Sequence, residues 1–131
     1  MKIKKLSLET LFNFAKGTEN VLSLTESRVR DSFIKPLSEI TQTYFDDRNK
    51  IYLAFCLKKE DGTPDFKNGN QYQFPSEKLS EINKELLILA NEEIEVNFSD
   101  NPQQIKGILE KSEYKPKLLE AETIDSILNA I

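Results

Sequence analysis

The sequence predicts an α+β fold in which amphipathic helices pack on a small, mostly antiparallel sheet of about three strands. Three observations favour this fold class. Apolar residues recur every three or four positions over most of the chain, which is the period of an amphipathic helix. The segment EEIEVNF at 92–98 alternates in polarity, as a strand does. Hydrophobic residues make up only 38% of the chain, too few for the long aliphatic runs of buried parallel strands.

The chain has 131 residues, which predicts a single domain over 1–131 with one hydrophobic core. Its one cysteine, Cys56, lies in the aliphatic segment IYLAFCL and is expected to be a buried, apolar-like side chain. No apolar run approaches the roughly 20 residues that span a bilayer, so we expect no membrane segment. The sequence therefore favours a protein of the reducing cytoplasm.

The N-terminal segment predicts a strand followed by a helix. MKIKK at 1–5 is typical of a short edge strand, whose lysines discourage further pairing. SLETLFNFAKG at 7–17 then predicts a helix, with Ser7 as its N-cap and Gly17 at its C-cap position.

The longest predicted helix begins at Ser23, because Ser23 and Glu26 have the spacing of a capping box. Pro36 lies inside this helix, where a proline removes a backbone donor and costs about 3 kcal/mol. The apolar stripe keeps its phase across the proline, so we expect one helix kinked near 32–36 rather than two helices. The stripe consists of Val29, Phe33, Leu37, Ile40 and Tyr44, continued by Ile51 and Phe55.

Two turn dipeptides, Asp61-Gly62 and Asn68-Gly69, mark the segment KKEDGTPDFKNGNQYQFP at 58–75. The second predicts a short hairpin between 64–66 and 71–74, with QYQF as the third strand of the sheet. A calcium loop does not fit, because no register places a glycine sixth and a glutamate twelfth. A polar hairpin remains the main interpretation, with a surface recognition tip as the alternative.

The C-terminal part predicts three further helices around the alternating strand. Ser76 is the expected N-cap of a helix that carries Leu79, Ile82, Leu86 and Leu89. Asp100 or Ser99 is expected to cap the helix in NPQQIKGILEKS, and EAETIDSILNAI forms a short C-terminal helix.

The composition excludes several kinds of active site. The chain has no histidine, which removes the commonest general base and metal ligand, and it has neither a P-loop nor GxGxxG. Neighbouring carboxylates such as Asp46 and Asp47 point about 100° apart on a helix and do not converge. We therefore expect a protein that is not an enzyme and that binds no cofactor and no metal. A carboxylate-dependent metalloenzyme is the least favoured alternative.

The net charge of −4 is concentrated in the C-terminal half, where residues 67–131 hold seven basic against twelve acidic residues. Glu92, Glu93 and Glu95 are a candidate docking edge for a basic partner, or simply the solvated face of a strand. Nucleic-acid contact is not expected, because acidic residues interleave with the basic ones of the long helix. Those basic residues are Arg28, Arg30 and Lys35, near Lys2, Lys4 and Lys5 of the N-terminus.

The order of these parts resembles a family of small phage proteins of uncharacterised function, found in phages and prophages of Gram-positive bacteria. The segments that carry the resemblance are MKIKKLSLETLFNF, SRVRDSFIKPLSEI, KKEDGTPDF, NGNQYQF and EINKELLILANEEIEVNF. Gene neighbourhood in that family implies a role in the virion or its assembly, and it implies no site residue.

These observations lead us to expect a non-enzymatic phage protein that acts by protein–protein contact, as a minor virion component or assembly factor. The alternative is an inhibitor that docks an acidic surface on a basic host protein of defence or transcription. The expected partner is a phage or host protein or a second copy of the chain, in the bacterial cytoplasm or the virion. The candidate interaction residues are Asp61, Gly62, Asn68, Gly69, Glu92, Glu93 and Glu95.

Overall fold

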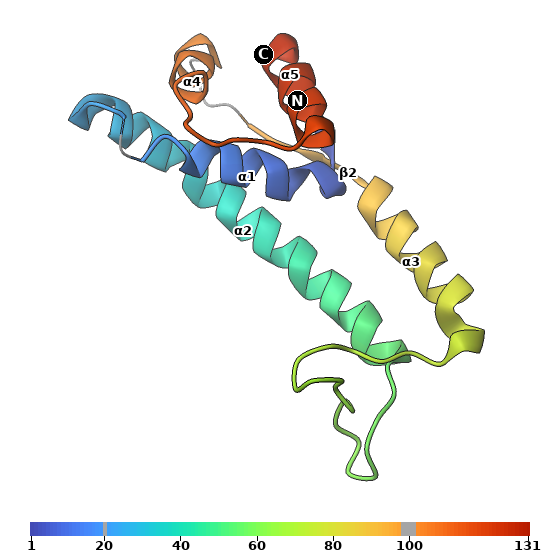
Figure 1. Ribbon diagram of the computed structural model, residues 1–131. Helices are drawn as coiled ribbons and strands as arrows, with labels where there is room; N and C mark the ends of the chain where they lie inside the picture. The colour runs from blue at the N-terminus through green and yellow to red at the C-terminus, as the bar shows by residue number, and fades with distance from the viewer. Residues whose placement is uncertain (20, 98–101) are drawn as a thin grey trace. The chain divides into compact units, whose positions relative to one another are not determined.

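A computed structural model of the chain describes residues 1–19, 21–97 and 102–131, and these residues are mostly helical (Figure 1). The elements in chain order are β1 (Lys2–Lys4), η1 (Lys5–Ser7), α1 (Leu8–Lys16), α2 (Leu24–Phe55), η2 (Ser76–Lys78), α3 (Leu79–Asn91), β2 (Glu93–Glu95), α4 (Pro102–Leu109) and α5 (Leu118–Ala130). The chain forms two compact units, and α2 contributes to both. Unit 1 comprises Met1–Gln42 and Glu93–Ile131, and unit 2 is Thr43–Glu92.

The sheet belongs to unit 1 and is antiparallel, as predicted. Strands β1 and β2 pair in a register that places Ile3 opposite Ile94. Ile3 is buried, whereas the lysines on either side of it are exposed, so the alternation of MKIKK is the pattern of a strand with one covered face. The α+β class is confirmed, but the prediction of about three strands is wrong, because the described residues form two. Phe98, expected at the end of the second strand, lies outside the described residues.

Helix α1 begins and ends where the sequence predicts. Ser7 stands at its N-cap, although the Ser7 side chain makes no capping hydrogen bond. Gly17 is the C-cap residue with φ −62°, so it is not needed there for a left-handed turn. The reason for a glycine is a close approach instead, because a Cβ at Gly17 would lie 2.3 Å from Oγ of Ser112. The N–H of Glu113 also donates to the carbonyl of Gly17 at 3.0 Å.

The capping box predicted for α2 is present. The N–H of Ser23 donates to Oε1 of Glu26 at 3.2 Å, and the N–H of Glu26 donates to Oγ of Ser23 at 3.3 Å. The helix then continues without a break through Pro36 to Phe55, as one element rather than two. Its stripe is also confirmed, since Phe33, Leu37 and Tyr44 are buried and Ile40 is half-buried.

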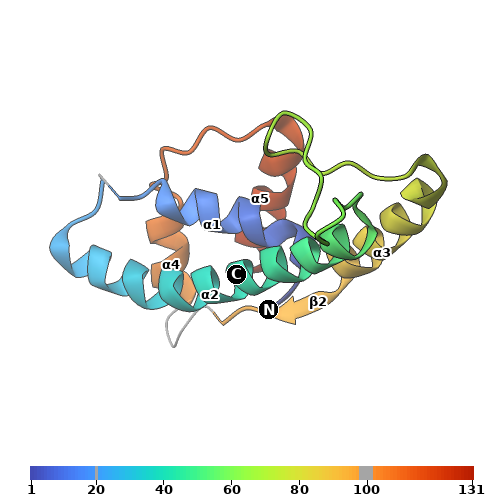
Figure 2. The same cartoon turned by 90° about the horizontal axis from the view of Figure 1, so that it is seen from below.

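The core of unit 1 lies around α1. Helix α1 has the first half of α2 on one side and α4 and α5 on the other (Figures 1 and 2), and it packs directly against α5. The buried apolar side chains of these helices in unit 1 are Leu8, Leu11, Phe14, Ala15, Phe33, Leu37, Ile105, Ile108, Leu109, Ile124 and Ile127. Each of these helices therefore buries one apolar face in the core of unit 1. Ser99 and Asp100, the expected caps of α4, lie outside the described residues.

Helix α5 starts at Leu118, two residues earlier than predicted. Glu120 explains the earlier start. Its side chain accepts a hydrogen bond of 3.2 Å from the N–H of Lys117, which caps the first turn. It also accepts one of 2.7 Å from the hydroxyl of Tyr114.

The third strand predicted for the sheet is absent from the described residues of unit 2. The segment QYQF is not a strand, because the predicted hairpin is reduced to a single bridge between Lys67 and Gln71. A second bridge joins Lys58 to Pro64 around the first turn. Pro64 has no N–H with which to extend a ladder. The aromatic rings of QYQF contact Tyr52 of α2 instead of lying on a sheet.

Helix α3 follows this loop and runs back beside the second half of α2 (Figure 1). Ser76 was expected to cap it, but Ser76 is the first residue of the 3-10 helix η2 and no side-chain cap is made. Cys56, at the end of α2, is buried as predicted. Apart from Cys56, the buried apolar side chains of unit 2 are Tyr44, Ile82 and Leu89.

Candidate interaction surface

The most exposed apolar side chains of unit 2 lie on α3. The helix carries five consecutive apolar residues, Leu86 to Ala90. Because successive residues are rotated by about 100°, such a run covers most of the circumference of a helix rather than one face. Leu89 is turned inward and buried, whereas Leu87 is 61% exposed and Ile88 is 57% exposed.

Ile88 lines a groove with an acidic rim, which we call the acidic groove. Its lining residues are Asp47 and Ile51 of α2, Glu85, Ile88 and Leu89 of α3, and Glu92 just beyond α3. The lining of the groove thus combines three aliphatic side chains with three carboxylates and contains no basic residue. Lys50 lies 3.6 Å from Asp47 one turn further along α2, but Lys50 is itself largely exposed.

Leu87 lines a different groove, which we call the aromatic groove. Its lining residues are Tyr44, Arg48 and Tyr52 of α2 and Asn83, Leu86, Leu87, Leu89 and Ala90 of α3. The single charge in this lining is the guanidinium of Arg48. That group lies 4.8 Å from the centre of the Phe45 ring and 5.8 Å from that of Tyr44, so cation–π contacts hold it beside the groove.

An aromatic cluster joins the loop of unit 2 to α2. The centre of the Tyr72 ring lies 5.0 Å from the centre of the Phe66 ring, 5.5 Å from that of Tyr52 and 6.2 Å from that of Phe74. The Tyr72 hydroxyl donates to Oδ1 of Asn49 at 3.2 Å. These contacts place the loop against the same helix that supplies one wall of each groove.

The four turn residues named as interaction candidates are exposed at the tips of the loop. Gly62, Asn68 and Gly69 have positive φ angles of 86°, 54° and 83°, which is the conformation that glycine and asparagine tolerate. Asp61 closes the first turn by accepting hydrogen bonds from Thr63. The Thr63 hydroxyl and then its N–H lower the pKa of Asp61. These roles are conformational, and an interaction through the four residues stays a prediction.

The acidic run named as a docking edge is divided between the two units. Glu92 lines the acidic groove of unit 2. Glu93 and Glu95 belong to β2, opposite Lys4 and Lys2 of β1. The amino group of residue 1 lies 2.5 Å from Oε1 of Glu95, and this hydrogen bond lowers the pKa of Glu95. The sheet thus supplies positive charge beside Glu93 and Glu95.

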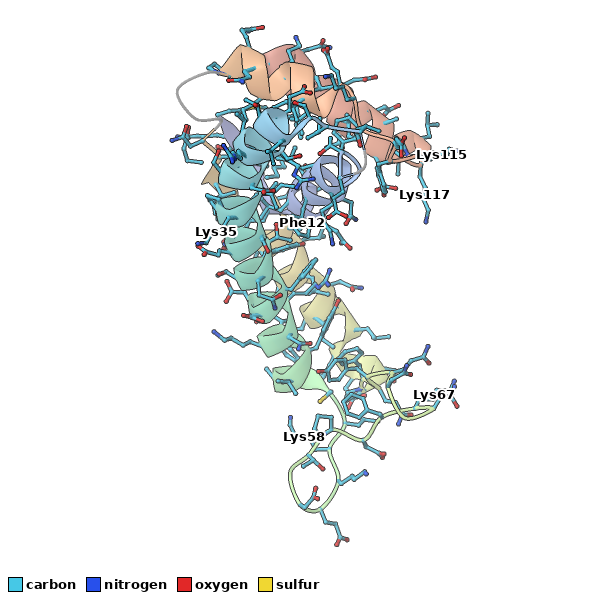
Figure 3. All side chains as sticks on the ribbon, turned by 90° about the vertical axis from the view of Figure 1, so that its left-hand side faces the viewer. Phe12, Lys35, Lys58, Lys67, Lys115 and Lys117 are labelled. Atoms are coloured by element: carbon cyan, nitrogen blue, oxygen red, sulfur yellow. The ribbon has the colours of Figure 1, made fainter. Side chains whose placement is uncertain are left out.

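The basic residues are spread over several elements. Figure 3 shows Lys35 on α2, Lys58 and Lys67 on the loop, and Lys115 and Lys117 before α5, with side chains directed away from the ribbon. Arg30 instead contacts its neighbour Asp31, with Nη2 at 2.7 Å from Oδ1.

Sequence reasoning did not single out four of the lining residues, Arg48, Glu85, Leu87 and Ile88, and it considered Asp47 only as a metal ligand beside Asp46. The available signal was the run LLILA, which exceeds the single apolar stripe assigned to this helix. Which charge lies beside which apolar residue depends on the pairing of α2 with α3, and that pairing is absent from any local pattern.

Among the described residues, no group of three or more His, Cys, Asp or Glu is placed to hold a metal ion. None of the helices described has the length and apolar character needed to cross a membrane. No protein-family model, curated protein or solved structure matches the chain.

Proposed function

We propose that this chain is a non-enzymatic phage-type protein that acts by protein–protein contact, as a minor virion component or assembly factor. The observation that carries the proposal is the exposure of Leu87 and Ile88 in two grooves of unit 2. The resemblance of the sequence to small phage proteins supplies the setting, namely the bacterial host cell and the particle assembled in it.

The energetics favour contact through these grooves. Full burial of a Leu or Ile side chain stabilises a complex by about 1.5–3 kcal/mol, and contiguous exposed apolar surface with a polar rim marks interaction sites. Asp47 and Glu85 line one groove and Arg48 lines the other, and charges at an interface select the partner more than they add affinity.

Purified particles test the proposal. In a Gram-positive lysogen that carries the gene, the wild-type protein is expected to sediment with its phage particles or their assembly intermediates. A Leu87→Asn/Ile88→Asn double variant should be lost from that fraction. Leu24→Asn is the matched control, because Leu24 is even more exposed, at 71%, but lies in unit 1. Equal sedimentation of the double variant and the wild type, or absence of both, would contradict the proposal.

A second candidate is an inhibitor that docks on a basic host protein, and the carboxylates of the acidic groove favour it. Association with such a protein should slow steeply as salt is raised, because exposed charges steer encounter only when unscreened. Glu85→Gln should reduce the association rate, whereas Asp125→Asn, an exposed carboxylate of α5, should leave it unchanged. An association rate insensitive to both salt and Glu85→Gln would exclude this mode of binding.

A further inference from the structure

We propose that copies of this chain associate head to tail, with the acidic groove of one copy against the aromatic groove of the next. The inference rests on the proposed function and deepens it by naming the partner as a second copy. It is carried by the opposite charge of two apolar grooves on one small helical unit.

Charge decides which grooves pair. A symmetric contact through the acidic groove would bring the carboxylates of both copies, Asp47 and Glu85 among them, into one interface whose linings hold no basic residue. A symmetric contact through the aromatic groove would bring two Arg48 guanidiniums into one interface whose linings hold no carboxylate. Like charges juxtaposed in an interface are unfavourable and act against such pairings. Contact between unlike grooves brings Arg48 to the carboxylates and is the combination without this repulsion.

The apolar side chains support the same arrangement. Leu87 and Ile88 are adjacent in α3 but line different grooves. Each groove therefore has an exposed apolar side chain of its own. In the unlike pairing, Leu87 and the Tyr44 and Tyr52 rings of one copy cover Ile51 and Ile88 of the next. Leu87 and Ile88 are then both removed from water at every junction.

A head-to-tail contact leaves one groove free at each end of an assembly. Such heterologous interfaces propagate until the rotation between neighbours closes a ring, or they continue as a filament. The assembly therefore extends beyond a dimer, which a symmetric contact through one groove does not.

Complementation between two groove variants tests this arrangement. Leu87→Asn blocks the aromatic groove and Ile88→Asn blocks the acidic groove, and both side chains are exposed, so folding is expected to persist. By light scattering, the wild type should form multimers and each variant should be a monomer. An equimolar mixture should form a one-to-one dimer and nothing larger, because each variant retains the groove that the other lacks. Leu24→Asn is the control and should assemble like the wild type.

A charge exchange provides a second, independent test. Arg48→Glu and Glu85→Arg should each raise the dissociation constant at least tenfold. The double variant Arg48→Glu/Glu85→Arg should recover most of the affinity, because the attraction is restored with its sign reversed.

Three outcomes would overturn the inference. If either single apolar variant still dimerises, the contact is symmetric through its intact groove. If both are monomers and the mixture stays monomeric, Leu87 and Ile88 belong to one shared interface. If the wild type is a monomer at about 1 mM, the weakest range of specific association, copies do not pair. In that last case, particle association that depends on Leu87 and Ile88 would still support the proposed function with a different partner.

Discussion

The ammonium group of Lys111 lies 2.6 Å from Oε2 of Glu26, which connects two residues of unit 1 that are 85 positions apart in the chain. Oε1 of the same carboxylate accepts the capping hydrogen bond from Ser23. The hydrogen bond from Lys111 and then the backbone N–H of Ser23 lower the pKa of Glu26. One carboxylate therefore both caps the N-terminus of α2 and forms an ion pair with the segment that follows α4.

The lowered pKa predicts a loss of stability in acid. The contribution of Glu26 is fully present above the ordinary glutamate pKa of about 4.3 and is lost as the pH falls through its lower folded-state value. The difference in free energy of unfolding between wild type and Glu26→Gln should therefore be larger at pH 7 than at pH 3. Urea denaturation at both pH values measures it. Glu110→Gln, at an exposed glutamate beyond α4, is the control for the loss of one carboxylate. An equal difference at the two pH values for Glu26→Gln would contradict the role of Glu26.

Gly17 and Gly107 should respond in opposite directions to alanine. A Cβ at Gly17 would meet Oγ of Ser112 at 2.3 Å and the backbone nitrogen of Tyr114 at 2.8 Å, so Gly17→Ala should destabilise by about 1–3 kcal/mol. Gly107 lies inside α4 with no atom within 4 Å of its Cβ position. Gly107→Ala should therefore stabilise by about 0.5–1 kcal/mol. Thermal denaturation of both variants checks the pair, and a neutral Gly17→Ala would show that the segment at 112–114 can move aside.

Alanine substitutions of a core leucine and of a surface leucine should differ in their effect on stability. Leu11 is 1% exposed, and Leu11→Ala should cost about 2–5 kcal/mol because it leaves a cavity in unit 1. Leu118 is 77% exposed, and Leu118→Ala should change stability by no more than about 0.5 kcal/mol. The measurement is the urea midpoint of each variant. A large effect at Leu118 would show that α5 is covered at its start.

The aromatic cluster of unit 2 should control access to Cys56. Tyr72→Ala removes three ring contacts beside the end of α2, each worth about 0.5–1.5 kcal/mol. If these contacts hold the loop over the buried thiol, the rate of labelling by a thiol reagent should rise about tenfold or more. Tyr72→Phe keeps the ring and loses only the hydroxyl bond to Asn49, so its labelling rate should stay near that of the wild type. Equal rates in both variants would contradict the role of the rings.

The elements that the sequence predicts well are those specified by local pattern. The capping box of Ser23 and Glu26 locates the start of α2, and the stripe from Phe33 to Tyr44 identifies its buried face. The prediction of a strand at QYQF was wrong because alternation alone does not supply a partner strand. The loop makes aromatic contacts with α2 instead.

The grooves were not predictable in the same way. A period of 3.6 residues assigns each helix one apolar face, whereas Leu87 and Ile88 lie on either side of that face. The close approach that requires a glycine at position 17 joins it to Ser112, a residue remote in sequence. Both features arise from contacts between segments, which no local pattern records.

In the sequence, unit 2 lies between the two parts of unit 1, and this order determines which unit can fold first during synthesis. Lys2 of β1 pairs with Glu95 of β2, so the sheet cannot form until residue 95 has been synthesised. At about 5–20 residues per second, β1 therefore remains unpaired for on the order of ten seconds. Unit 2 has only contacts among 43–92 to form and can fold within that time. On a messenger read by several ribosomes, its two grooves are thus exposed to neighbouring nascent chains before unit 1 is complete, and co-translational assembly becomes available to this chain.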